Sequence, residues 1–188
     1  RLSLPSDART SIKEYNIDSS RGYGNYNPYT AFNIGNCTWY AFGRAWEILG
    51  YYPSKLAFSG DAEVWFEKNK NNYDTGNGGF PYSSDRNRPE LGAIAVWENT
   101  SDAYGTGGHV AVVEQITNNS DGTKTIITSE SAYASYYFNT VTRSTASEGL
   151  GWSGKWKFLG YIYLGDYTPI PEGSEMTTGA GRTIPDGD

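Results

Sequence analysis

The sequence predicts an α+β fold, with helices in the first half of the chain and strands in the second half. Apolar residues recur at helical spacing from Trp39 onward, whereas runs rich in β-branched and aromatic residues begin near residue 93. A chain of 188 residues with 15% aromatic residues and 23 glycines is typical of a loop-rich fold that contains β-structure. Helices that come first and strands that follow indicate α+β rather than alternating α/β.

The first helix is predicted between Asn36, a suitable N-cap, and Gly50, a suitable C-terminal cap. Its apolar face is formed by residues at intervals of three, four and three: Trp39, Phe42, Trp46 and Leu49. Cys37, the only cysteine, falls in the first turn of this helix. Unpaired backbone N–H groups and the helix dipole favour a thiolate over a thiol at that place. The sequence therefore gives Cys37 an activating environment.

The remaining elements follow in order along the chain. A second, shorter helix is predicted over residues 61–69 with Ser59 as its N-cap, and the chain from there to residue 90 is predicted to be a long loop. Four strands are predicted after this loop, over residues 93–97, 109–116, 123–129 and 158–164.

One domain with tails is expected, because the chain can bury a core but is too short for two large domains. Residues 1–27 are predicted to be an N-terminal extension or linker, and residues 167–188, rich in Pro, Gly, Ser and Thr, a C-terminal linker or tail. The first residues have no signal-peptide core, so a leader or upstream segment is expected before Arg1. We expect a monomer that can belong to a longer multidomain chain.

Charge and composition exclude several kinds of partner. A net charge of -6 and a pI of about 4.8 argue against nucleic acid, which needs a basic face. No apolar run approaches the roughly 20 residues that span a membrane. One cysteine cannot form an internal disulfide, and one cysteine with one histidine cannot fill a four-ligand zinc site without carboxylates. No cofactor is expected.

The only histidine, His109, begins a valine-rich predicted strand and follows two glycines that permit close approach of another backbone. The turn at residues 118–122 makes this strand and the next an antiparallel hairpin, so His109 is expected roughly opposite Glu130. Opposite residues have Cβ atoms about 4.5 to 5.5 Å apart, within reach of an imidazole–carboxylate hydrogen bond. Together with Cys37, these residue types form the parts of a Cys-His-Glu relay.

The chain resembles the CHAP family of cysteine, histidine-dependent amidohydrolases and peptidases over about residues 28–166, the predicted catalytic domain. The resemblance is carried by five segments in the same order: GNCTWYAFGRAWE, PELGAIAVWE, GGHVAVVEQI, IITSES and FLGYIYL. It implies a papain-like fold, in which N-terminal helices, with the nucleophile at a helix N-terminus, pack on an antiparallel sheet or half-barrel. It also implies a secreted or phage-encoded peptidoglycan hydrolase that cuts an amide bond, as an endopeptidase or an N-acetylmuramoyl-L-alanine amidase.

The resemblance assigns a role to each site residue. Cys37 becomes the nucleophile, His109 the base and Glu130 the group that orients the base, while the backbone N–H of Cys37 helps to hold the oxyanion. Asn36 occupies a slot where relatives often carry Gln, Asn or Glu, so it is a candidate for the oxyanion site, although capping explains it equally well.

The chain departs from the family pattern in two ways. Ser131 and Ala132 follow the glutamate where many relatives have x-Asn, and the acidic calcium loop of some phage lysins is not evident. A fourth catalytic residue is therefore not expected. Calcium stays open as a ligand, but no convincing metal site is found.

Aromatic residues in or near loops are candidates for lining a substrate groove: Tyr29, Trp39, Tyr104 and Tyr133. Trp39 is explained more simply as a core residue. Two other functions stay open. A non-catalytic wall-binding or adhesion module is indicated by the tyrosine-rich loops and the linker-like tail, and a CHAP-fold amidase with another peptide substrate is possible because fold and relay do not specify the acyl group.

Overall fold

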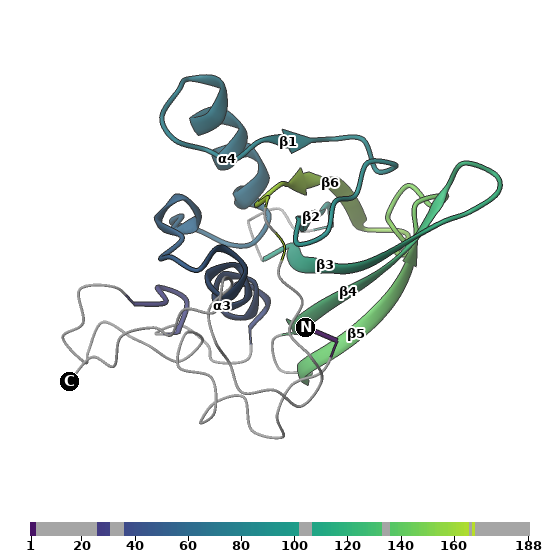
Figure 1. Cartoon of the computed structure of the whole chain (residues 1–188), viewed down its shortest axis with the longest axis horizontal. Coiled ribbons are helices and arrows are strands. Elements are labelled where there is room, and N and C mark those ends of the chain that lie inside the picture. The colour runs from purple at the N-terminus through teal and green to yellow at the C-terminus, as the bar shows by residue number, and fades with distance from the viewer. Residues whose placement is uncertain (3–25, 31–35, 102–106, 133–135, 166, 168–188) are drawn as a thin grey trace.

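The computed structural model describes residues 1–2, 26–30, 36–101, 107–132, 136–165 and 167. In this part of the chain, two α-helices and one short 3-10 helix accompany a six-stranded antiparallel sheet (Figure 1). The helical elements are α3 (Cys37–Leu49), η2 (Ser54–Leu56) and α4 (Val64–Asp74). The structure confirms the predicted α+β class.

The strands lie across the sheet in the order β1-β6-β2-β3-β4-β5, and every neighbouring pair is antiparallel. Their bounds are β1 (Tyr82–Ser83), β2 (Ile94–Asn99), β3 (His109–Asn118), β4 (Lys124–Ala132), β5 (Tyr136–Ser144) and β6 (Trp156–Ile162). Helix α3 packs against β3 and β4, and α4 packs against β6 (Figure 1). The helix that begins with Cys37 thus lies beside the strand that begins with His109, as expected of a papain-like arrangement.

Helix α3 begins and ends where the sequence predicts. The Asn36 backbone is extended, and its side chain accepts a hydrogen bond from the Cys37 backbone N–H. At the other end, Gly50 takes the left-handed conformation with a φ of 71°, and its N–H donates to the Trp46 carbonyl. Both ends are therefore set by residues adjacent to the helix, which is why local sequence identifies them.

Helix α4 differs from the prediction at both ends, since it runs from residue 64 to 74 instead of 61 to 69. Ser59 is not its cap: the N-cap position is held by Glu63, whose side chain makes no capping bond. Instead, the Glu63 backbone N–H donates to the Gly107 carbonyl at 3.0 Å. The start of this helix is fixed by a distant segment of the chain, which local sequence signals do not report.

Two strands were not predicted. β1 has two residues and exists only through its pairing with β6, while β5 has nine residues and forms one edge of the sheet. The four predicted strands are present, with ends that differ by up to three residues.

Both faces of the sheet are covered by buried side chains. One cluster lies between the helices and the sheet, and includes Trp39, Phe42, Trp65, Val110 and Val112. The other lies on the opposite face, and includes Trp97, Ala111, Val113, Leu150 and Tyr161. Strand β3 contributes alternate residues to both clusters, which explains its continuous run of valine and alanine.

A buried ion pair joins α3 to the sheet. The Arg44 guanidinium donates to both carboxylate oxygens of Glu114, at 2.8 and 3.0 Å. The Ser129 hydroxyl on β4 donates to the same carboxylate at 2.7 Å, and it accepts from the Tyr40 hydroxyl of α3 at 2.8 Å. A buried charge is tolerated only when it has partners of this kind. Because these partners come from α3, β3 and β4, the network holds the helix against the two strands.

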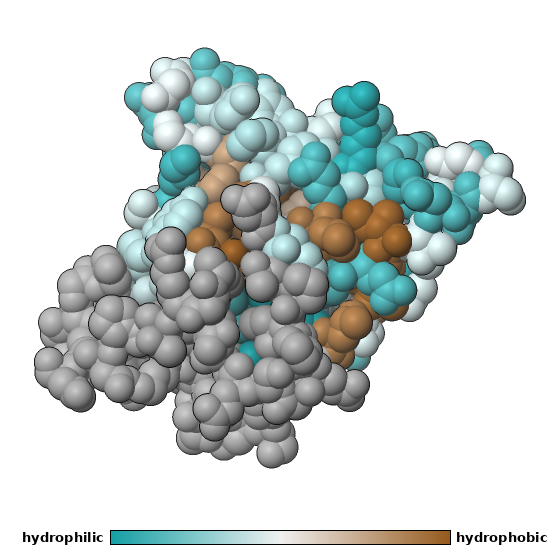
Figure 2. All heavy atoms as spheres, viewed as in Figure 1, coloured by the Kyte–Doolittle hydropathy of each residue, from teal (hydrophilic) through white to brown (hydrophobic). Residues whose placement is uncertain are grey.

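Figure 2 shows hydrophilic residues over α4 and over the outer end of the β3–β4 hairpin, with apolar residues gathered over the middle of the sheet. In the described part of the chain, no helix has both the length and the apolar character that crossing a membrane requires.

Candidate active site

Cys37 is the first residue of α3, and 6% of its surface is exposed. Its backbone N–H donates to the Asn36 Oδ1 atom at 2.7 Å. The capping explanation of Asn36 is therefore present in the structure. The same bond engages the Cys37 N–H that the resemblance assigned to the oxyanion, so this hydrogen bond has to open before that N–H can bind an oxyanion.

His109 is the first residue of β3, and the two glycines before it hold it in place. Gly108 has a φ of 59°, and a Cβ atom there would lie 2.3 Å from the Trp97 carbonyl oxygen and 2.6 Å from the Glu63 Cβ. Since only glycine tolerates this approach, the structure confirms the close backbone contact expected at this point. His109 also pairs with Trp97 of β2 in the sheet.

Glu130 contacts His109 as predicted, but through a different register. Val112 pairs with Ser129, and the same register continued to the start of β3 would place His109 opposite residue 132 rather than 130. The β3–β4 pairing contains a bulge between Val113 and Gln115. The carboxylate instead reaches His109 diagonally, and Glu130 Oε2 lies 2.5 Å from His109 Nε2.

Cys37 is the third member of this group, because its side chain lies close enough to the His109 ring to raise the pKa of the imidazole. Since Nε2 is bonded to Glu130, Nδ1 is the ring nitrogen left for the thiol. The structure thus brings together all three residues of the predicted relay. They lie at the start of β3.

Electrostatics make His109 and Glu130 an ion pair. Burial lowers the pKa of His109, but the hydrogen bonds and charges of Cys37 and Glu130 outweigh it and raise that pKa to about 9. Burial raises the pKa of Glu130, but the hydrogen bond and charge of His109, with the charge of Arg143, lower it to about 2. At neutral pH the imidazole is therefore protonated and the carboxylate is ionised.

Sequence reasoning missed several residues that surround this pair. Arg143 on β5 and Thr128 on β4 both donate to Glu130 Oε1 at 2.8 Å. The indole rings of Trp97 and Trp152 lie 5.7 and 5.0 Å from the His109 ring, measured between ring centroids. The sequence did not indicate β5 as a strand, so nothing in it placed Arg143 beside Glu130.

The groove prediction fails for two of its four residues. Tyr29 and Trp39 are 6% and 0% exposed. The Tyr29 hydroxyl donates to the Leu56 carbonyl at 2.8 Å, and its ring packs against Phe42 and Trp65. Both side chains belong to the core. Aromatic packing and a hydrogen-bonded hydroxyl hold Tyr29 there. Tyr104 and Tyr133 lie outside the described residues.

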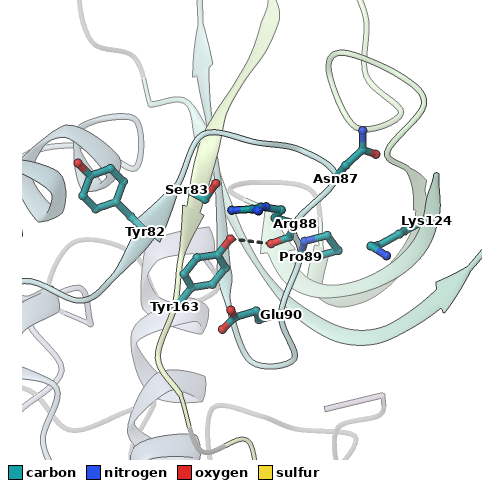
Figure 3. Close-up of a pocket in the computed structure, with 8 residues that line it drawn as sticks. All are labelled: Tyr82, Ser83, Asn87, Arg88, Pro89, Glu90, Lys124 and Tyr163. Atoms are coloured by element: carbon teal, nitrogen blue, oxygen red, sulfur yellow. Dashed lines mark hydrogen bonds between the residues drawn. The ribbon is translucent and has the colours of Figure 1, made fainter. Parts of the chain in front are cut away.

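No group of three or more His, Cys, Asp or Glu side chains in the described ranges is placed to hold a metal ion. A cavity of about 420 Å³ is lined by residues from the segment 82–90 together with Lys124 and Tyr163, whose side chains are drawn in Figure 3. The Tyr163 hydroxyl donates to the Arg88 carbonyl at 2.6 Å across one wall. Lys124 pairs with Asn118, at the end of β3 remote from His109, so this cavity is separate from the Cys37–His109–Glu130 group.

Comparison with known proteins points to one family. The sequence model of the CHAP domain matches residues 24–132, more than half of the chain and a range that contains all three members of the group. An N-acetylmuramoyl-L-alanine amidase of known structure from Staphylococcus aureus is similar at 28% sequence identity and a TM-score of 0.44. The match covers 69% of this chain and 30% of the amidase chain. Among curated proteins, none matches the sequence significantly.

Proposed function

Since this chain belongs to the CHAP domain family, we propose that it is a cysteine-dependent peptidoglycan hydrolase that cleaves an amide bond of the bacterial cell wall. The observation that supports this most is that the only thiol lies close enough to the only imidazole to raise its pKa, while Nε2 of that imidazole is bonded to a buried carboxylate. Nucleophilic catalysis by cysteine needs these parts in this order. The site of action is proposed to be outside the cell, for a secreted or phage-encoded protein.

In the proposed acylation, the proton that Cys37 and His109 share lies on the imidazole, and the Cys37 sulfur attacks the amide carbonyl carbon as a thiolate. The carbonyl oxygen becomes an oxyanion in the tetrahedral intermediate. The His109 imidazolium then protonates the leaving nitrogen, the carbon–nitrogen bond breaks, and an amine leaves a thioester on Cys37. Glu130 keeps the imidazole in the tautomer and orientation that this transfer requires.

In the proposed deacylation, His109 takes a proton from water, and the resulting hydroxide attacks the thioester carbon. The carbon–sulfur bond breaks, a carboxylic acid is released, and the Cys37 thiolate again faces the protonated His109. The oxyanion in both steps needs donors at the start of α3. The Cys37 N–H can serve once it leaves the Asn36 side chain, and the N-terminal end of the helix dipole favours negative charge there.

Release of amines from purified peptidoglycan tests the proposal. We expect the wild-type protein to release amines and Cys37→Ala to release none above background, with both proteins folded as judged by circular dichroism. A wild-type protein without activity contradicts the proposal. If Cys37→Ala clears cell walls as well as the parent, a binding or wall-disrupting module explains the effect instead.

The identity of the bond follows from mass spectrometry of the digested muropeptides. An amidase yields intact stem peptides with a free N-terminal alanine and glycan fragments without peptide. An endopeptidase yields new amines within the stem or bridge while alanine stays joined to muramic acid. Cleavage of generic peptides but not of muropeptides would instead assign another peptide substrate to this fold.

A further inference from the structure

We propose that Arg143 is a positioning residue that locks the Glu130 carboxylate into its hydrogen bond with His109, and that Trp97, Trp152 and the Leu150 carbonyl hold Arg143 for this task. The inference rests on the proposed function, since it assigns a part in the same relay. It adds a second layer behind the carboxylate that the sequence did not reveal.

Both oxygens of the Glu130 carboxylate are used, and the residue is 0% exposed. Oε2 faces His109, while Oε1 accepts hydrogen bonds from Thr128 Oγ1 and from Arg143 Nη2, each at 2.8 Å. A carboxylate held at one oxygen only can rotate about its terminal bond. The contacts at Oε1 remove that freedom, so they fix the direction of the bond to the imidazole.

The guanidinium is itself fixed on several sides. Arg143 Nε donates to Thr128 Oγ1 at 3.0 Å, and Nη1 donates to the Leu150 carbonyl at 3.3 Å. Its central carbon lies 4.5 Å from the ring centroid of Trp97 and 4.5 Å from that of Trp152. These two rings are 5.2 Å apart and inclined at 52°, so the guanidinium lies in the angle between them. Cation–π contact with two indoles suits arginine better than lysine.

The turn after β5 supplies these contacts. Leu150 has a φ of 49°, a conformation that costs a non-glycine residue energy, and it presents its carbonyl to the guanidinium. Trp97 Nε1 donates to the Gly149 carbonyl at 3.0 Å, and Gly149 forms an isolated bridge with Trp152. The same turn therefore places both an acceptor for the arginine and a ring against His109.

Two positively charged groups flank the Glu130 carboxylate. Glu130 lies between the His109 imidazolium and the Arg143 guanidinium, and both cations favour its ionised form. Without Arg143, the carboxylate would lose one of its two partners at Oε1, together with the nearby positive charge, and would protonate at higher pH. A protonated Glu130 can no longer stabilise an imidazolium, so in a variant without Arg143 the His109 ring would lose its orientation at acidic pH.

The test uses Arg143→Met, Arg143→Lys and a matched control, Arg44→Met. Arg44 is also buried and also pairs with a buried carboxylate, but that carboxylate belongs to Glu114 and not to the relay. Because the chain has a single histidine, NMR can follow the imidazole of His109 against pH without ambiguity. Hydrolysis of soluble muropeptides gives kcat and KM for the same variants.

We expect Arg143→Met to shift the acid-side change in the His109 signal to higher pH and to lower kcat at least tenfold with little change in KM. Arg143→Lys should show a smaller shift of the His109 signal and a smaller loss of kcat, because lysine keeps the positive charge but lacks the planar guanidinium group. Arg44→Met should lose thermal stability without shifting the His109 signal. The proposal would be overturned if Arg143→Met left both the His109 signal and kcat unchanged. It would also be overturned if Arg44→Met changed them as much as Arg143→Met does. An inert wild-type protein whose His109 signal responds as expected would refute the hydrolase assignment but leave the positioning role standing.

Discussion

At the scale of single residues, the candidate site depends on what surrounds common side chains. A lone free cysteine is more often a small buried residue than a nucleophile, and Cys37 is indeed buried. Its place at a helix start and its influence on the pKa of His109 separate it from an ordinary core thiol. Glu130 would likewise be an ordinary strand residue if His109 and Arg143 did not share its carboxylate.

Replacing Glu130 by Gln tests the carboxylate directly. We expect kcat/KM to fall at least about tenfold, because the imidazole loses its orienting group. The alkaline limb of the pH profile, which reports loss of the His109 proton, should also move to lower pH, since Glu130 is one of the groups that raise the pKa of His109. Steady-state rates from pH 5 to 10 provide the measurement. Glu98→Gln, on the surface near the same end of the sheet, is the control and should leave the limb in place.

The three relay residues could be predicted from sequence, but their supporting layer could not. Cys37 and His109 are the single members of their residue types, and a hairpin turn brings Glu130 near His109 without further information. Arg143 reaches Glu130 only through the pairing of β4 with β5, which follows a loop with no turn signature. Tyr29 was wrongly assigned to a groove and Trp39 is the core residue that the simpler explanation made it, since residue type alone does not tell which aromatic side chains the fold exposes.

At the scale of elements, the site is built from one helix start and one strand start. The ends of α3 were predictable because their caps are adjacent in sequence, whereas α4 starts where Glu63 meets Gly107. The hairpin was predictable in its topology but not in its register, because a β-bulge adds a residue to β3. Local sequence signals thus predicted where the elements lie along the chain, but they predicted less well how those elements contact one another.

Loss of the α3 cap should destabilise the fold measurably. Asn36→Ala removes the acceptor for the Cys37 N–H, and we expect the free energy of unfolding to fall by about 1 kcal/mol. Asn36→Asp keeps a capping oxygen and should retain most of that stability. Urea denaturation of the three proteins makes the comparison, and an alanine variant as stable as the wild type would show that the cap contributes little.

The glycine before His109 should be much harder to replace than an unobstructed turn glycine. Gly108→Ala combines positive φ with a Cβ atom 2.3 Å from the Trp97 carbonyl oxygen, so we expect a loss of more than about 2 kcal/mol and displacement of the imidazole. Gly122 also has positive φ, 84°, but nothing lies within 4 Å of the place that a Cβ atom would take there. Gly122→Ala should therefore cost only about 1 kcal/mol and leave activity intact. Equal losses of stability and activity in both variants would contradict the steric account.

At the scale of the whole molecule, one buried charge network links a helix to the sheet and another links two strands of the sheet. Arg44 and Glu114 join α3 to β3, and Arg143 and Glu130 join β5 to β4. Buried pairs of this kind contribute little net stability but cost about 3–5 kcal/mol when one partner is removed. We therefore attribute the stability of the fold to its two apolar clusters, and the geometry of the site to the charged groups between them.

The His109–Glu130 pair gives the whole fold a defined pH dependence. The pKa of His109 is raised in the folded protein, so its stabilisation is complete below 6.5 and is lost as the pH rises through about 9. The pKa of Glu130 is lowered, so its stabilisation is present above 4.5 and is lost as the pH falls towards about 2. The difference in unfolding free energy between the wild type and His109→Gln should be largest from about pH 4.5 to 6.5. Urea denaturation across pH 3 to 10 measures it, and a difference that grows from pH 6.5 to 9 would have the wrong sign.

The central claim is that Cys37 and His109 form one proton-sharing pair supported by Glu130. NMR titration of the single imidazole in the wild type and in Cys37→Ala tests it most directly. The account predicts that the wild-type pKa of His109 lies near 9, well above the ordinary 6.5, and that it falls when the sulfur is removed. An imidazole that titrates near 6.5 in both proteins would contradict it.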